Sequence, residues 1–137
     1  MENDGIMIRT KSIYKEREDS DGVRASVMSR HTLEDGFTPD PKITRSSYDV
    51  WLQGVSPPAN LVGDYYRRGL PFDEYTKRYL EFLRTPDVAE EVKLLAKNGL
   101  ELIITLLCVE ESAEFCHRRI LAEECKRYEP GLVIEHK

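Results

Sequence analysis

Residues 85–107 constrain the fold more than any other part of the chain. Thr85 and Pro86 are of the types that begin helices, apolar residues then recur at helical spacing, and Gly99 is of the type that ends one. Residues 100–107 are almost continuously apolar, as in a strand covered on both faces of a sheet. A helix, a glycine turn and a buried strand form the building unit of α/β proteins. We predict a single compact α/β domain over residues 1–137, with a mostly parallel sheet of four to five strands flanked by helices.

The rest of the chain supplies further elements for this domain. Hydrophobic alternation predicts strands at 6–14, 23–30 and 132–134. Helical spacing predicts helices at 47–53 and 60–68, one that begins at Asp73, and one capped by Ser112 that runs to about Tyr128. Residues 31–46 show no hydrophobic periodicity, which predicts a long irregular loop. Residues 1–5 and 135–137 are expected to be frayed termini.

Composition excludes several classes of protein. The longest apolar run is far shorter than the roughly 18 residues of a membrane span, and the first residues lack the pattern of a signal peptide. We therefore expect a cytoplasmic protein that does not enter membranes. Three cysteines in 137 residues indicate reduced thiols rather than a disulfide framework. The formal net charge of -5 disfavours a general nucleic-acid coat.

The most chemically dense segment follows the predicted buried strand. Cys108 and Glu110 stand at the end of that strand, and Cys116, His117 and Arg118 stand at the start of the next helix. Open α/β sheets bind their ligands at the carboxyl ends of the strands. The free N–H groups at a helix N-terminus favour anions. This segment therefore predicts a site for a small anionic or nucleotide-like ligand.

The same residue types can support thiol-dependent catalysis. A thiol near a helix N-terminus and basic groups has a lowered pKa and is a better nucleophile. Whether the protein is an enzyme stays open at this stage, as do its reaction and its oligomeric state. The candidate roles are Cys108 or Cys116 as nucleophile, His117 or Glu110 as general acid or base, and Arg30 with Arg118 as a clamp for the anion.

A metal or another cofactor is not expected. Cys108, Glu110, Cys116 and His117 are acceptable zinc ligands, but the chain has no Cys-x-x-Cys pair. If the helix began at Ser112, the adjacent side chains of Cys116 and His117 would diverge by about 100°. The spacing therefore opposes a compact zinc site.

Two other interpretations remain open. In the first, the cluster is structural: His117 bonds to backbone or to Glu124, the cysteines are small buried hydrophobes, and Arg118 pairs with Glu110. In the second, the protein is a non-catalytic module that binds nucleic acid or an acidic partner. Its basic residues would be Arg67, Arg68, Lys77 and Arg78. The tyrosines interleaved with them are expected to lie at the edge of the core, with their hydroxyls in water.

The pattern Cys108-x-Glu110 followed by Cys116-His117-Arg118 resembles an uncharacterised family, domain of unknown function 488. The resemblance extends over residues 8–126, with Arg30 similar to the family's strand-end arginine and residues 51–61 similar to its tryptophan, proline and leucine segment. Members commonly carry a tryptophan-proline-arginine-glycine turn after that arginine, whereas residues 31–36 differ here. The resemblance implies a compact α/β domain with a polar cleft and implies no established activity.

Overall fold

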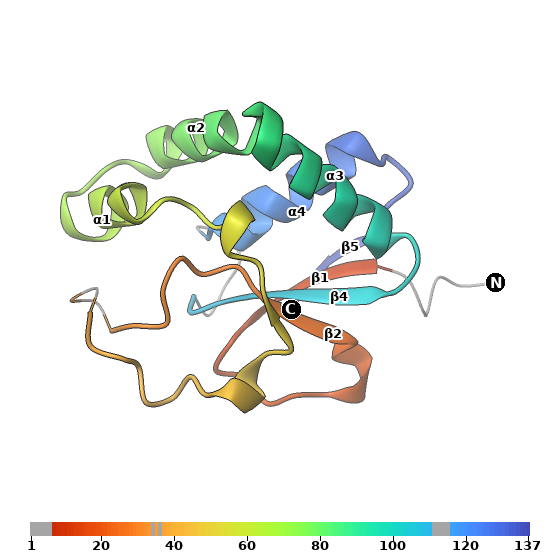
Figure 1. The fold of residues 1–137 in the computed structure, drawn as a ribbon, viewed down its shortest axis with the longest axis horizontal. Helices are drawn as coiled ribbons and strands as arrows, with labels where there is room; N and C mark the ends of the chain where they lie inside the picture. Colours follow the sequence, from red (N-terminus) through yellow and green to blue (C-terminus); the bar gives the residue numbers. More distant parts are fainter. Residues whose placement is uncertain (1–6, 34, 36, 111–115) are drawn as a thin grey trace.

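A computed structural model describes residues 7–33, 35, 37–110 and 116–137 of the chain. These residues form one sheet of five parallel strands together with four α-helices, which confirms the predicted α/β class (Figure 1). The order of the strands across the sheet is β3-β2-β4-β1-β5. Their bounds are β1 Met7–Ser12, β2 Val23–Ser26, β3 Val50–Trp51, β4 Ile103–Cys108 and β5 Ile134–His136.

The strand β4 lies at the centre of the sheet, as its apolar sequence predicts. It pairs with β1 on one side, where Ile8 stands opposite Ile104, and with β2 on the other, where Ala25 stands opposite Leu106. All four of these side chains are buried in the main hydrophobic core. The strand begins at Ile103 rather than at residue 100, because the three residues before it complete the turn that follows the preceding helix.

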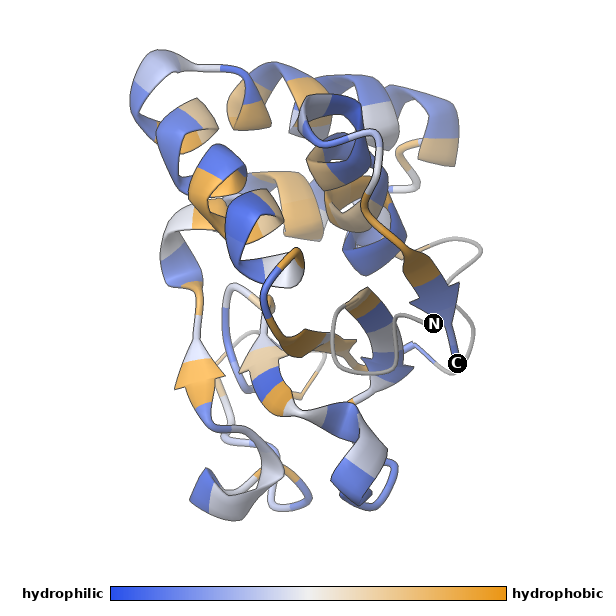
Figure 2. Cartoon of the chain, turned by 90° about the vertical axis from the view of Figure 1, so that its right-hand side faces the viewer, coloured by the Kyte–Doolittle hydropathy of each residue, from blue (hydrophilic) through white to orange (hydrophobic). Residues whose placement is uncertain are grey.

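The helices pack together against one face of the sheet (Figure 1). Hydrophobic residues gather where the helices face one another and the sheet, and hydrophilic residues cover their outer turns (Figure 2). Pro86 begins its helix after Thr85, as predicted, whereas Asp73 lies inside the first turn of a helix capped by Pro71. The helix bounds are α1 Ala59–Arg67, α2 Phe72–Leu83, α3 Pro86–Gly99 and α4 His117–Tyr128.

The opposite face of the sheet carries buried charge. Arg9, Lys11 and Arg24 project from β1 and β2 on this face, and all three contact the carboxylate of Asp21. The segments that follow β1 and β2 cover this face, so the charged groups are almost completely buried. We call these four residues the Asp21 cluster.

The helix predicted at residues 47–53 is wrong. These residues form β3 and flanking turns, because the segment adds to the edge of β2: Asp49 N donates to Arg24 O at 2.7 Å, and Leu52 N donates to Ser26 O at 2.8 Å. The aromatic side chains whose spacing suggested a helix are used differently. Trp51 stacks on His31 with ring centroids 3.9 Å apart, and its Nε1 donates to Met28 O at 2.6 Å.

Two boundaries near the carboxyl terminus also differ from the predictions. The last helix begins at His117, and the expected Ser112 cap lies outside the described residues. The last strand begins at Ile134, two residues later than predicted, and pairs with β1. Among the described residues, no helix is long and apolar enough to cross a membrane.

Candidate functional site

The carboxyl ends of β1, β2 and β4 meet at one edge of the sheet. Beyond the last paired residues, Ile13 N donates to Cys108 O at 2.7 Å and Val27 N donates to Leu107 O at 3.1 Å. The chain leaves the sheet here after each strand, so side chains from three segments converge. This is the edge at which parallel sheets place their ligands.

A thiol and an imidazole are in contact at this edge. Cys108 Sγ lies 3.7 Å from His117 Nδ1, and His117 Nε2 lies 2.8 Å from Val27 O. A carbonyl oxygen only accepts hydrogen bonds, so Nε2 carries a proton and, in the neutral ring, Nδ1 presents its lone pair to the thiol. Both side chains are buried, with Cys108 1% and His117 4% exposed. The expected backbone bond of an inward-facing histidine is confirmed, and it leaves the other nitrogen for Cys108.

Cys116 joins this pair because it is not part of the helix. It caps α4 with an extended backbone, at φ -125° and ψ 144°. The sulfur atoms of Cys108 and Cys116 and a ring nitrogen of His117 all lie within 4.8 Å of one another. The argument that Cys116 and His117 must diverge is therefore wrong, since it assumed a helix that began earlier.

These three side chains are close enough to share a thiophilic metal ion, such as zinc. One neighbour opposes that use. Arg118 Nη1 lies 3.6 Å from Cys116 Sγ, which places a buried positive charge beside one of the sulfurs. The absence of a metal remains a prediction, and metal analysis of the purified protein tests it.

Arg118 is fully buried and only partly partnered. Its Nη1 donates to Glu110 O at 2.7 Å, but its Nε and Nη2 have no hydrogen-bond partner among the described residues. The expected ion pair between Arg118 and the Glu110 side chain does not form. The Glu110 carboxylate instead accepts from Tyr66 Oη at 2.8 Å. A buried guanidinium that lacks a carboxylate partner is costly unless an anion compensates it.

The two thiols at this edge differ in acidity. Burial acts to raise the pKa of Cys108, but hydrogen bonds from Cys116 and from backbone N–H groups, together with the charge of Arg118, lower it overall. Burial and the neighbouring Cys108 raise the pKa of Cys116. Cys108 is therefore the thiol with the lower pKa of the two.

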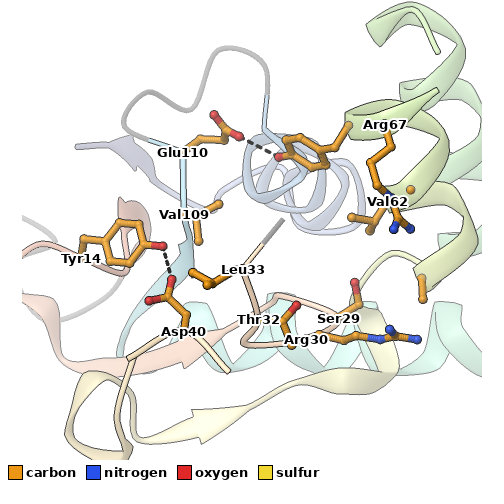
Figure 3. A pocket seen from close by; sticks show the side chains of 13 residues that line it. Tyr14, Ser29, Arg30, Thr32, Leu33, Asp40, Val62, Arg67, Val109 and Glu110 are labelled. Atoms are coloured by element: carbon orange, nitrogen blue, oxygen red, sulfur yellow. Dashed lines mark hydrogen bonds between the residues drawn. The ribbon is translucent and has the colours of Figure 1, made fainter. Parts of the chain in front are cut away.

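A pocket of about 290 Å³ opens beside this cluster (Figure 3). Of the residues predicted for the site, Arg30 and Glu110 line the pocket, whereas Cys108, Cys116, His117 and Arg118 do not. Its wall combines apolar side chains with hydroxyls and charges. The lining residues are Tyr14, Ser29, Arg30, Thr32, Leu33, Asp40, Ala59, Val62, Gly63, Tyr66, Arg67, Val109 and Glu110.

Two tyrosines in the wall donate to carboxylates, and the sequence did not single them out. Tyr14 Oη bonds to Asp40, and Tyr66 Oη bonds to Glu110 (Figure 3). Burial and the contact with Asp40 raise the pKa of Tyr14 to about 12. Tyr66 directly precedes Arg67 and Arg68, which were considered above as contacts for nucleic acid. No local sequence pattern indicated the contact of Tyr14 with Asp40, because a long loop brings these two residues together.

The tyrosines of α2 are buried, which corrects the expectation that their hydroxyls reach water. Tyr79 is completely buried and donates to Val55 O at 2.6 Å. Tyr75 is 1% exposed, and its Oη has no partner among the described residues. Its ring lies 6.4 Å from that of Tyr79, which in turn lies 5.9 Å from the ring of His117. One aromatic ring thus separates Tyr75 from the group of Cys108, Cys116 and His117, which we call the thiol cluster.

The second basic segment is largely neutralised. Arg68 Nε lies 2.6 Å from Asp64 Oδ1, and Arg78 Nη2 lies 2.9 Å from Asp64 Oδ2. One carboxylate thus holds two of the four cations proposed to contact nucleic acid. This pairing lowers the positive potential that such an interface needs.

Comparison with known proteins supports the family resemblance. The family model described as the active DUF488-N3 subclade matches residues 8–129. No curated protein and no solved structure gives a significant match. Because the match spans most of the chain and includes the whole thiol cluster, the chain belongs to the DUF488 family.

Proposed function

We propose that this protein is a thiol-dependent enzyme that acts on a small anionic or nucleotide-like ligand bound at the carboxyl edge of its sheet. The contact between Cys108 Sγ and His117 Nδ1, with the ring oriented by Val27 O, carries this proposal. A nucleophile, a base and a group that orients the base are the parts that covalent catalysis requires. The matching subclade is described as active, which agrees with an enzymatic role.

The cluster supports a simple first step. Cys108 Sγ forms a bond to the electrophilic atom of the ligand while its S–H proton passes to His117 Nδ1. The bond to the leaving group breaks, and His117 returns the proton to that group. Cys116 Sγ lies within 4.8 Å of the Cys108 sulfur, and its interaction with that sulfur lowers the pKa of Cys108 and so favours the thiolate form. The expected location is the cytoplasm, where thiols stay reduced.

Charged residues on both sides of the pocket wall fit an anionic ligand. Arg30 lines the pocket itself, and Arg118 lies directly behind Glu110, whose backbone oxygen it contacts. We assign Arg30 and Arg118 to the anion, and the Glu110 carboxylate to a polar contact or proton transfer with the ligand. Two guanidinium nitrogens of Arg118 have no partner among the described residues, which is not expected of a purely structural cluster.

The test compares two cysteines that are equally buried. Cys108 and Cys125 are 1% and 0% exposed, so access for a small reagent is matched, but only Cys108 contacts a histidine. At pH 7 we expect iodoacetamide to modify Cys108 at least about tenfold faster than Cys125, as resolved by peptide mass spectrometry. The His117→Gln variant should lose most of this difference. Equal rates for the two cysteines in the native protein would contradict the proposal.

A further inference from the structure

We propose that Arg118 and Tyr75 form a buried subsite for a tetrahedral oxyanion, the phosphoryl group of the ligand, behind the pocket wall at Glu110. This inference deepens the proposed function, because it names the chemical group that would be held next to Cys108. It rests on buried polar groups that have no hydrogen-bond partner among the residues described.

The guanidinium of Arg118 provides the first observation. It is completely buried, and Nε and Nη2, which lie on one edge of the group, have no partner among the described residues. Its remaining contacts are Nη1 with Glu110 O at 2.7 Å and with Cys116 Sγ at 3.6 Å. The edge formed by Nε and Nη2 has the fork geometry that binds two oxygens of a phosphate or carboxylate.

Tyr75 provides an independent second observation. Its ring is fixed by stacking on Tyr65, with centroids 4.6 Å apart, and its buried hydroxyl has no partner among the described residues. The Tyr75 ring centroid lies 6.4 Å from that of Tyr79, which lies 5.9 Å from the ring of His117, the residue before Arg118. It is a neutral donor on α2, a helix that packs against α4.

The position of these donors fits an anion. Arg118 lies in the first turn of α4, a helix of 12 residues, where the helix dipole favours negative charge. A water molecule could accept hydrogen bonds from Arg118 and Tyr75, but it would leave the buried positive charge uncompensated. A tetrahedral oxyanion has enough oxygens for the guanidinium edge, the hydroxyl and a further group at once.

Glu110 connects the subsite to the pocket. Its carboxylate lines the pocket and accepts from Tyr66, and its backbone oxygen accepts from Arg118. The body of a ligand would lie against the apolar wall formed by Leu33, Val62 and Val109, and its phosphoryl group would reach the buried donors. The phosphoryl group would then stand next to Cys108, within the cluster that carries out the chemistry.

Titration with inorganic phosphate tests the subsite, with Tyr79→Phe as a matched control for Tyr75→Phe. Both variants remove a buried hydroxyl from α2, but within the described part of the chain only Tyr79 Oη has a partner, Val55 O. We expect Tyr75→Phe to keep the Tm of the unliganded protein and to weaken phosphate binding about fivefold, the effect of one hydrogen bond. Tyr79→Phe should lower the Tm and leave the phosphate Kd unchanged. The Arg118→Met variant should not bind phosphate.

Three outcomes would overturn the inference. These are no phosphate binding by the native protein, an unchanged phosphate Kd in Tyr75→Phe, and formate binding as tight as phosphate, which would assign the subsite to carboxylates. The alkylation rates of Cys108 and Cys125 separate this inference from the proposed function. Fast modification of Cys108 without phosphate binding refutes the subsite alone, whereas phosphate binding with equal rates refutes the thiol enzyme alone.

Discussion

Two clusters of buried charge lie on opposite sides of the same sheet, and they differ in how completely their cations are partnered. In the Asp21 cluster, Arg24, Lys11 and Arg9 each have an oxygen of the Asp21 carboxylate within 3.3 Å. At the carboxyl edge, the partners of Arg118 among the residues that the structure describes are one carbonyl oxygen and one thiol. Arg24 and Arg118 are the same residue type and are equally buried, at 1% and 0% exposure.

The difference separates a structural arginine from one that is available to a ligand. Arg24 also donates to Ser47 O at 2.8 Å and to Lys15 O at 3.2 Å, so it ties two covering segments to the sheet. Arg118 donates to one carbonyl, and two of its nitrogens have no partner in the part of the chain that the structure describes. Folding rarely leaves buried polar groups without partners, and this supports the anion subsite that we propose.

Removing the shared carboxylate should have the largest effect. In Asp21→Ala, three buried cations lose their common anion, so we expect the free energy of unfolding to fall by about 3–5 kcal/mol. Urea denaturation at pH 7 measures this decrease in the free energy of unfolding. The exposed neighbour Asp19 provides the control, since Asp19→Ala should change stability by no more than about 0.5 kcal/mol. A loss below about 1 kcal/mol for Asp21→Ala would show that the cluster is not structural.

The same substitution should lower the free energy of unfolding much more at Arg24 than at Arg118. Arg24→Met breaks bonds to Asp21 and to three carbonyls, and we expect it to destabilise the fold by about 2–4 kcal/mol. Arg118→Met removes a poorly partnered buried charge, and we expect the unfolding free energy to stay within about 1 kcal/mol of the native value. Equal destabilisation by the two variants would remove the distinction between the clusters.

A third buried charge provides an intermediate case with a pH dependence. Burial acts to raise the pKa of Glu124, but hydrogen bonds from Arg84 and Arg127 outweigh it and hold the pKa at about 2. A lowered folded-state pKa contributes stability above the unfolded value of 4.5, and this contribution is lost as pH falls from 4.5 towards 2. Both arginines are half exposed, so we discount the contribution to about 1–2 kcal/mol.

The Glu124→Gln variant measures this contribution. Its unfolding free energy at pH 7 should be lower by about 1–2 kcal/mol, and the difference from the native protein should disappear near pH 2. Urea denaturation across this range gives both values. A difference that stays constant with pH would mean that the charge of Glu124 does not contribute.

The smallest effect is expected at the pocket wall. Tyr66 is 43% exposed, and its bond to Glu110 can be replaced by water. We expect Tyr66→Phe to change the unfolding free energy by no more than about 0.5 kcal/mol. A loss above about 1.5 kcal/mol in thermal or urea unfolding would make this wall part of the structural core.

The sequence predicted those parts of the molecule that local signals determine. The helix that starts at Pro86 and the buried strand after Gly99 follow from capping residues and an apolar run, and both are present. The meeting of Cys108 and His117 followed from the topology of parallel sheets, because the strand end and the next helix start at the same edge.

The remaining features depend on contacts between distant segments. β3 forms because the backbone N–H groups of Asp49 and Leu52 donate to β2. The helical spacing of the aromatic residues in this segment predicted a helix instead. Cys116 lies beside Cys108 because α4 begins at His117, which leaves Cys116 outside the helix as its cap. No sequence feature indicated that the buried Tyr75 hydroxyl lacks a partner among the described residues. The sequence shows which residues are polar but not which of them lack hydrogen-bond partners in the fold.

An experimental structure of the protein with inorganic phosphate tests the central claim most directly. The account predicts a tetrahedral anion within about 3 Å of Arg118 Nε or Nη2 and of Tyr75 Oη, next to the Cys108 sulfur. A structure in which Arg118 pairs with a carboxylate of the protein, or in which only water contacts Arg118 and Tyr75 at saturating phosphate, would contradict it.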